Sequence, residues 1–154
     1  MKVLVVEDSP IVVARLVELL EGLPNLEVVG SAGDADDAIR RVSLSAPDVI
    51  VLDLHLAGGT GLEVLRAAKG GPRKIVVIVL TNFASALFRQ ACLEAGAEYF
   101  LDKSNEFDQL PALLEHIRGE SGSDGTMGSS GQAAETGHRE LGSKTSHGRR
   151  TGTR

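Results

Sequence analysis

Short apolar runs that alternate with helical patterns are the feature that most restricts how this chain can fold. Each run is too short for an amphipathic helix and lacks polar alternation, which is the pattern of strands covered on both faces. The clearest runs are residues 3–6, 49–52, 75–80 and 99–101. Because such strands occur in parallel sheets between layers of helices, we expect a sheet of this kind here.

The segments between the runs carry the apolar spacing of helices. Apolar residues recur three or four positions apart and form one stripe per segment that a helix would bury. Ser9 followed by Pro10 is a favourable helix start, because the hydroxyl caps free amides and proline has no amide hydrogen to lose. Strand and helix patterns alternate five times. They predict an α/β fold with a doubly wound, five-stranded parallel sheet in the order 2-1-3-4-5 and helices on both faces.

The composition changes abruptly after residue 118. From Gly119 onward Gly, Ser and Thr dominate, and the large apolar residues are Met127 and Leu141 alone. Such a segment cannot bury enough apolar surface to offset the chain entropy lost on folding. We therefore predict one domain over residues 1–118 and a disordered, mildly basic tail over residues 119–154.

Charge, hydropathy and cysteine content restrict the partners and the compartment. The net charge is −5, and acidic residues outnumber basic ones within residues 1–118, which argues against a broad nucleic-acid surface. No segment has the roughly 18 uninterrupted apolar residues of a membrane span, and the first residues do not form a secretory leader. Cys92 is the single cysteine, so no disulfide can form within the chain. We expect a cytoplasmic protein without membrane or direct nucleic-acid contacts.

Polar residues follow each of the four runs, and their chemistry differs from run to run. Glu7 and Asp8 follow the first run, Asp53 the second, Thr81 the third, and Lys103 stands soon after the last. The carboxyl ends of parallel strands meet at one edge of a sheet, so these side chains are expected to lie together. Three neighbouring carboxylates repel one another unless a cation neutralises them, and Mg²⁺ favours carboxylate ligands. The run ends therefore predict a magnesium site.

This set of groups is suited to accepting a phosphoryl group. Asp53 is the candidate nucleophile, which would form an acyl phosphate while the metal neutralises the phosphoryl oxygens. Thr81 can donate a hydrogen bond to the phosphoryl group, and Lys103 can supply a positive counter-charge. Taken singly, Asp8 could equally cap the next helix, Thr81 could simply end a strand, and Lys103 could be a solvated charge. Their joint occurrence at strand ends favours the phosphoacceptor site.

Short motifs surround these residues in a fixed order. They are Val3-Leu4-Val5-Val6-Glu7-Asp8, Pro47-Asp48-Val49-Ile50-Val51-Leu52-Asp53 with Gly61-Leu62, Leu80-Thr81, Ala95-Gly96-Ala97 and Lys103. From residue 1 to about residue 118, the chain resembles the receiver domain of bacterial two-component response regulators, of the stand-alone, chemotaxis-regulator-like kind. The resemblance implies a flavodoxin-like fold and a signalling function.

The resemblance also assigns roles to the polar residues. It implies that a histidine kinase phosphorylates Asp53 in the presence of Mg²⁺. Thr81 is then the switch hydroxyl, and Lys103 is the lysine of the phosphorylation site. The implied metal ligands are Glu7, Asp8, Asp53 and the backbone carbonyl of His55.

Phe100, three residues before Lys103, falls where the family carries a switch aromatic. The resemblance implies that phosphorylation of Asp53 draws Thr81 toward the phosphoryl group and turns this ring inward. Phe100 could instead be an ordinary core residue. If it is the switch, the face formed by the fourth helix, fifth strand and fifth helix is the expected contact surface for a downstream target protein, with Tyr99 on or beside it.

Two loops depart from the family pattern. Ser104 follows Lys103 where the family usually has proline, often in a cis peptide, and a cis bond before serine costs roughly 2.5–4 kcal/mol. Ala57 likewise replaces a frequent proline in the loop after Asp53. We therefore expect the loop that presents the lysine to be built differently in this chain.

His55 and Phe83 stand two positions beyond Asp53 and Thr81, at places that flank the path of the hydrolytic water in receivers. The bulky apolar ring of Phe83 should hinder that water. We therefore predict a phosphorylated state that lasts longer than in relatives with small or acidic residues there. His55 could take part in proton transfer, but a solvent-facing loop position is the simpler interpretation.

The leading functional hypothesis is a phosphoacceptor that signals by protein contact, and not an enzyme with a separate substrate. Two alternatives are a phosphorelay intermediate that passes phosphate to a histidine phosphotransfer protein and a truncated DNA-binding response regulator. A haloacid-dehalogenase-like phosphatase is disfavoured, because that family needs an acid two positions after the nucleophile, where His55 stands here. A dinucleotide-binding module is disfavoured because residues 58–61 do not form the glycine fingerprint after the first strand.

Overall fold

The computed structural model describes residues 1–121, and the chain divides into two compact units, Met1–Leu113 and Leu114–Arg154. The first unit contains the whole sheet and all the site residues predicted from the sequence. The described part of the second unit, residues 114–121, continues a helix that begins at residue 110. Most of the predicted tail lies outside the described residues, so the domain boundary at residue 118 stays a prediction.

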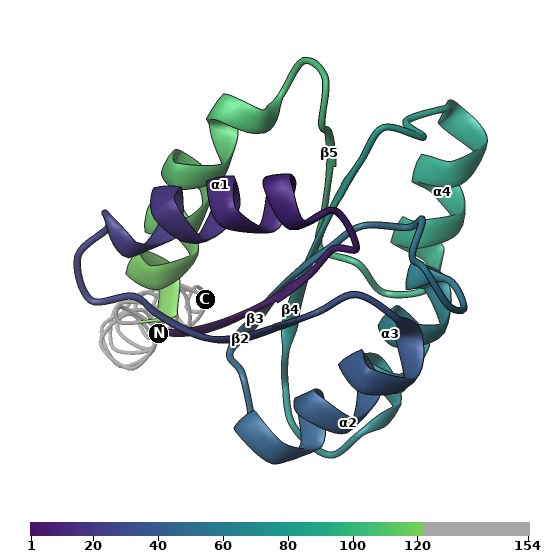
Figure 1. The fold of residues 1–154 in the computed structure, drawn as a ribbon, viewed down its shortest axis with the longest axis horizontal. Coiled ribbons are helices and arrows are strands. Elements are labelled where there is room, and N and C mark those ends of the chain that lie inside the picture. The colour runs from purple at the N-terminus through teal and green to yellow at the C-terminus, as the bar shows by residue number, and fades with distance from the viewer. Residues whose placement is uncertain (122–154) are drawn as a thin grey trace, which may run out of the picture. The chain divides into compact units, whose positions relative to one another are not determined.

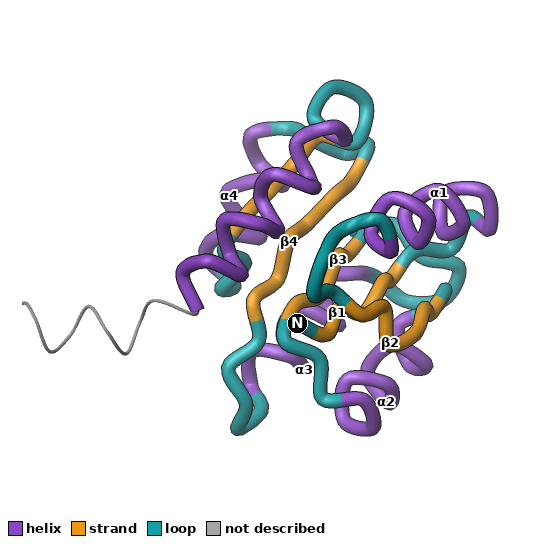
Figure 2. Tube along the Cα trace, turned by 90° about the vertical axis from the view of Figure 1, so that its left-hand side faces the viewer, coloured by secondary structure: helices purple, strands orange, loops and turns teal. Residues whose placement is uncertain are grey.

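A five-stranded sheet with the order β2-β1-β3-β4-β5 is the framework of the first unit (Figures 1 and 2). Each pair of neighbouring strands in it is parallel. The sheet confirms the predicted fold class and strand order. Its strands are β1 Lys2–Val6, β2 Glu27–Ala32, β3 Val49–Leu52, β4 Val76–Thr81 and β5 Tyr99–Asp102.

Helices cover both faces of this sheet, with α1 on one face and α2 and α3 on the other (Figure 1). The last described helix follows a 3₁₀ turn that places Pro111 in the first helical turn, where its missing N–H removes no intrahelical hydrogen bond. Within residues 1–121, no helix is long and apolar enough to cross a membrane. The helices are α1 Pro10–Glu21, α2 Ala35–Ser45, α3 Gly61–Gly70 and α4 Ala86–Glu94, then the 3₁₀ turn Phe107–Gln109 and the helix 110–121.

The side chains of the central strands fix how the strands align. Every residue of β3 is buried, as are the last four residues of β1, which explains the continuous apolar runs. On one face, Leu4, Val6, Ile50 and Leu52 form a buried cluster with residues of α2, α3 and α4. A slip of one residue would turn these side chains to the opposite face, so the cluster holds the register in which the strands end.

Polar side chains cap the helices directly after the strands. Ser9 accepts a hydrogen bond from the backbone N–H three residues later, and Pro10 opens α1, which confirms the predicted helix start. Asp34, Thr60 and Ser85 cap α2, α3 and α4 in the same way. Each cap satisfies a free backbone N–H at the start of its helix, at the edge of the sheet where the site was predicted.

Candidate functional site

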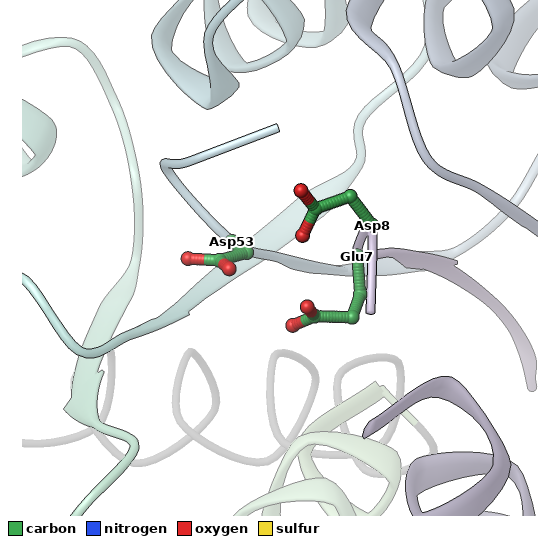
Figure 3. A group of neighbouring side chains, drawn as sticks. All are labelled: Glu7, Asp8 and Asp53. Carbon is green, nitrogen blue, oxygen red and sulfur yellow. The ribbon is translucent and has the colours of Figure 1, made fainter. Parts of the chain in front are cut away.

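The ends of β1 and β3 bring three carboxylates together (Figure 3). Val6 pairs with Leu52 across the two strands, and the N–H of Asp53 donates to the carbonyl of Val6 at 2.9 Å. Glu7, Asp8 and Asp53 each offer one carboxylate oxygen, and these oxygens all lie within 4.8 Å of one another. The group can therefore hold a metal ion, and an all-oxygen ligand set suits a hard divalent cation.

Lys103 brings a positive charge to the same group from the end of β5. Its Nζ lies 2.7 Å from Oε1 of Glu7 and 3.0 Å from Oδ2 of Asp53. Its backbone N–H donates to the carbonyl of Thr81 at 2.8 Å, which ties the loop to β4. The side chain of Lys103 is 11% exposed, and those of Glu7 and Asp53 are 3% and 8% exposed. Water and salt screen buried charges only weakly. The charges of Lys103, Glu7 and Asp53 therefore interact strongly.

Burial and these ion pairs shift the protonation of the buried groups. Burial raises the pKa of Glu7, and the charge of Asp53 adds to this, while hydrogen bonds with Lys103 and the Ser9 N–H oppose it. Burial by itself would lower the pKa of Lys103, but hydrogen bonds to Glu7 and Asp53 outweigh burial and leave that pKa raised. Lys103 therefore stays charged. This one ammonium bonds two of the three carboxylates, so the group lacks positive charge and is suited to a cation.

Gly61 allows the loop that carries Asp53 to pack against the start of α3. A Cβ at residue 61 would stand 2.2 Å from the carbonyl oxygen of Asp53 and 2.8 Å from Cα of Leu54. The N–H of Gly61 also donates to the carbonyl of Leu54 at 2.9 Å. Backbone atoms cannot rotate aside as side chains do, so only glycine fits here. The Gly61-Leu62 motif thus reflects close packing behind the site.

Thr81 and Phe100 are both buried on neighbouring strands, β4 and β5. The Oγ1 of Thr81 accepts a hydrogen bond from the N–H of Phe83 at 3.2 Å, which leaves the hydroxyl hydrogen available to another acceptor. Phe100 is 5% exposed, so its ring points inward. This burial fits both hypotheses for Phe100, the core residue and the switch aromatic.

His55 and Phe83 meet beside the carboxylates. Their ring centroids lie 5.4 Å apart at an interplanar angle of 45°, and Phe83 is 48% exposed. The N–H of His55 points at Oδ1 of Asp53 from 3.4 Å. The two residues thus stand together at the mouth of the site. The role of the His55 carbonyl as a metal ligand stays a prediction.

Two acidic residues that shape the lysine loop were missed by the sequence analysis. Asp102 accepts hydrogen bonds from the N–H of Ser104 at 2.9 Å and from Nδ2 of Asn105 at 3.0 Å. Glu106 accepts one from the N–H of Asp102 at 2.7 Å. These bonds organise the turn after Lys103 without a proline. An aspartate often accepts a hydrogen bond from the backbone N–H two residues later and so forms an Asx turn. Asp102, two residues before Ser104, was therefore a local sequence signal for this turn.

The fold and the carboxylate group define a receiver-type signalling domain. Residues 3–115 match the family model for the response regulator receiver domain. The chain therefore belongs to the response regulator receiver domain family, as the sequence motifs indicated. Membership supports a phosphoacceptor role in two-component signalling.

Relatives of known kind are longer than the part that this chain matches. The chain is 36% identical to the DNA-binding transcriptional activator DevR/DosR of Mycobacterium tuberculosis, over 75% of this chain and 54% of that protein. It is 32% identical to a protein-glutamate methylesterase/protein-glutamine glutaminase of Clostridium acetobutylicum, over 75% of this chain and 34% of that protein. The response regulator domain of Thermotoga maritima CheB matches with a TM-score of 0.67 at 31% identity, over 77% of this chain and 93% of that one. The chain thus spans about half the length of these curated relatives, or less.

Proposed function

We propose that this chain is a Mg²⁺-dependent phosphoacceptor that receives a phosphoryl group from a histidine kinase on Asp53. One observation carries the proposal: three carboxylate oxygens lie within 4.8 Å of one another, and Lys103 bonds two of the residues that supply them. Carboxylates so placed can hold a divalent cation, and the ammonium can face an incoming phosphoryl group. Membership of the receiver family supports the same chemistry.

Phosphorylation would proceed by attack of an Asp53 carboxylate oxygen on the phosphorus atom of a phosphohistidine. An O–P bond forms as the P–N bond breaks, and the imidazole leaves with the bonding electron pair. Mg²⁺, held by Glu7, Asp8, Asp53 and the backbone carbonyl of His55, would supply charge neutralisation at the phosphoryl oxygens. Lys103 keeps its proton, so it can move a hydrogen bond from Asp53 to a phosphoryl oxygen.

Thr81 and Phe100 are the proposed switch residues. The hydroxyl hydrogen of Thr81 would be donated to the phosphoryl group, which draws the end of β4 toward Asp53. Phe100 lies on the next strand and packs inside the unit, so its ring would follow that movement. The rings of His55 and Phe83 would meanwhile restrict the approach of water to the acyl phosphate and slow hydrolysis.

The surface formed by α4, β5 and the start of the helix 110–121 is the proposed contact site for a downstream target protein. Leu93, Tyr99 and Ala112, one from each element, line a shared hollow there. Leu93 is 44% exposed in this hollow, and large exposed apolar side chains on one face are typical of interaction sites. Output would therefore need no catalysis on a separate substrate.

The proposed setting is the cytoplasm, where histidine kinases phosphorylate receivers and where the single buried thiol of Cys92 would stay reduced. No direct contact with a membrane or with nucleic acid is part of the proposal. In the phosphorelay variant, Asp53 would pass its phosphoryl group on to a histidine phosphotransfer protein by the reverse of the same reaction.

Acetyl phosphate with Mg²⁺ tests the proposal without knowledge of the kinase. Mass spectrometry should find one phosphoryl group on Asp53, and none after chelation of the metal with EDTA. Asp53→Asn removes the nucleophile and keeps the shape of the side chain, so it should abolish labelling. A protein that stays unlabelled by acetyl phosphate and by phosphorylated kinases, or that is labelled equally in Asp53→Asn, would refute the assignment.

A receiver that belongs to a DNA-binding regulator is the second candidate. The observation that favours it is the likeness to DevR/DosR, which is named a DNA-binding transcriptional activator and of which this chain covers 54%. A gel-shift assay with phosphorylated protein and promoter DNA separates the two candidates. Specific retardation of DNA by this chain would favour the second.

A further inference from the structure

Arg89 of α4 contacts the predicted switch aromatic in two ways. One guanidinium nitrogen donates to the backbone carbonyl of Phe100 at 3.2 Å, and Cζ lies 4.8 Å from the centroid of the Phe100 ring. The other terminal nitrogen lies 4.0 Å from Oε1 of Glu106. A planar guanidinium can make these three contacts at once, because its N–H donors lie along its edges and its face stacks on aromatic rings. Arg89 thus packs against the ring and the backbone of Phe100 from α4.

Glu106 extends this contact to the turn that presents Lys103. The same Oε1 that faces Arg89 accepts a hydrogen bond from the N–H of Asp102 at 2.7 Å, and the N–H of Glu106 donates to the carbonyl of Asp102 at 2.7 Å. Asp102 directly precedes Lys103, whose Nζ lies 3.0 Å from Asp53. A continuous set of polar contacts therefore joins the phosphoacceptor residue to α4.

We propose that Arg89 is a positioning residue of the phosphorylation switch, which couples the Lys103 turn and the Phe100 ring to the exposed face of α4. This inference rests on the proposed function, because it assigns the route by which phosphorylation of Asp53 reaches α4. When the Lys103 ammonium leaves Asp53 for a phosphoryl oxygen, its turn moves, and Glu106 carries that movement to Arg89.

The surface that would change is apolar. Leu87 and Phe88, the two residues before Arg89 in α4, are 78% and 46% exposed. Leu87, Phe88 and Arg89 belong to one helix, so a shift of Arg89 would also move the apolar surface that a partner protein can bind. Phosphorylation and partner binding are linked reciprocally, so a partner that holds α4 in one position would in turn favour phosphorylation.

The structure predicts that Arg89 matters more for this coupling than for folding. The side chains of Arg89 and Glu106 are 44% and 32% exposed and stand 4.0 Å apart. Ion pairs so exposed contribute little to the free energy of unfolding. Loss of a coupling contact, by contrast, typically changes a switch equilibrium by about fivefold or more.

Three variants test the proposal in the full chain. Arg89→Met keeps about the length of the aliphatic part of the side chain but removes the charge and the donors. Glu106→Gln keeps the acceptor for the Asp102 N–H but removes the charge. Arg66→Met makes the same change as Arg89→Met on the exposed surface of α3 and serves as the matched control. Each variant is titrated with Mg²⁺ and beryllium fluoride, a phosphoryl mimic. The readout is the fluorescence of Tyr99, the only tyrosine in a chain without tryptophan.

The expected result separates coupling from chemistry. Arg89→Met should still accept phosphate from acetyl phosphate on Asp53, but its Tyr99 response should need at least about fivefold more beryllium fluoride than the wild type. Arg66→Met should match the wild type. The Arg89→Met/Glu106→Gln double variant should be little worse than Arg89→Met alone, because both changes break one contact.

Two results would overturn the inference alone. One is a Tyr99 response in Arg89→Met equal to that of Arg66→Met, and the other is full additivity of the two single changes. Arg89→Lys, which keeps the charge but not the planar face, should recover only part of the response, and full recovery would count against the contact with the Phe100 ring. Absence of a phosphoryl group on Asp53 in the wild type would instead refute the proposed function, and the inference with it.

Discussion

Replacement of Gly61 by alanine should destabilise the first unit by displacing the loop that carries Asp53. The added Cβ would stand 2.2 Å from the carbonyl oxygen of Asp53 and 2.8 Å from Cα of Leu54, whereas ordinary contacts begin at 3.4 Å. Both neighbours are backbone atoms, so the clash cannot be relieved by a change of rotamer. The start of α3 and the loop must therefore separate by about 1 Å in a region packed at the density of a crystal.

The expected loss of unfolding free energy in Gly61→Ala follows from the cost of overpacking. Extra atoms in a well-packed region cost typically about 1–3 kcal/mol, and rigid backbone neighbours place Gly61→Ala at or above the upper end, near 3 kcal/mol. That is a large share of the roughly 5–15 kcal/mol by which domains are stable. A unit of this size lies between the domain sizes that shift by about 4–8 °C and by about 2–4 °C per kcal/mol, so at about 4 °C per kcal/mol the thermal midpoint should fall by about 12 °C.

Gly70→Ala is the matched control, because it makes the same change at the other end of α3. Nothing lies within 4 Å of a Cβ at residue 70, so alanine there should be neutral or stabilising by up to about 1 kcal/mol. Urea denaturation followed by circular dichroism measures both variants, and Mg²⁺ titration shows whether the Asp53 loop has moved. Free energies of unfolding for Gly61→Ala and Gly70→Ala that agree within about 0.5 kcal/mol would refute the packing argument.

Three further predictions concern the site and the buried thiol. Lys103→Met should slow labelling of Asp53 by acetyl phosphate about 100-fold, because a preorganised cation is lost. The same variant should bind Mg²⁺ more tightly in a titration, since Glu7 and Asp53 lose their ammonium partner. An unchanged rate of Asp53 labelling would argue against the role of Lys103. Phe83→Ala should shorten the lifetime of the acyl phosphate several-fold by mass spectrometry, and an equal lifetime would show that the ring does not exclude water. Cys92 is 1% exposed and burial raises its pKa, so a thiol reagent should modify the folded protein at least about tenfold more slowly than the protein in urea. Fast modification in buffer would contradict that burial.

The bounds of the edge strand β2 could not be predicted from the sequence pattern. β2, Glu27–Ala32, has one buried residue, at its last position, and its pairing with β1 shifts register between Val3 and Leu4. The sequence alternation predicts that a second strand exists but does not delimit it. An edge strand packs on fewer neighbours than β1 or β3, so fewer of its positions must be apolar, and its bounds depend on pairing with β1.

The strand-end residues show the opposite case. Glu7, Asp8, Asp53 and Thr81 follow uninterrupted apolar runs, and parallel strands that belong to one sheet bring their carboxyl ends to one edge. Local periodicity and the identity of the next residue were therefore sufficient to predict that the carboxylates meet. In the structure, one oxygen of each of the three carboxylates lies within 4.8 Å of the others, as that prediction requires.

Periodicity and spacing are properties of short segments, so they were enough to predict the sheet, its helices and the polar residues at the strand ends. Contacts between groups far apart in the chain could not be predicted in this way. Lys103 bonds Glu7 and Asp53 across separations of 96 and 50 residues, and Arg89 reaches both Phe100 and Glu106. Such contacts depend on distances between elements to within about an ångström, which are set by the packing of the whole unit and by no local pattern.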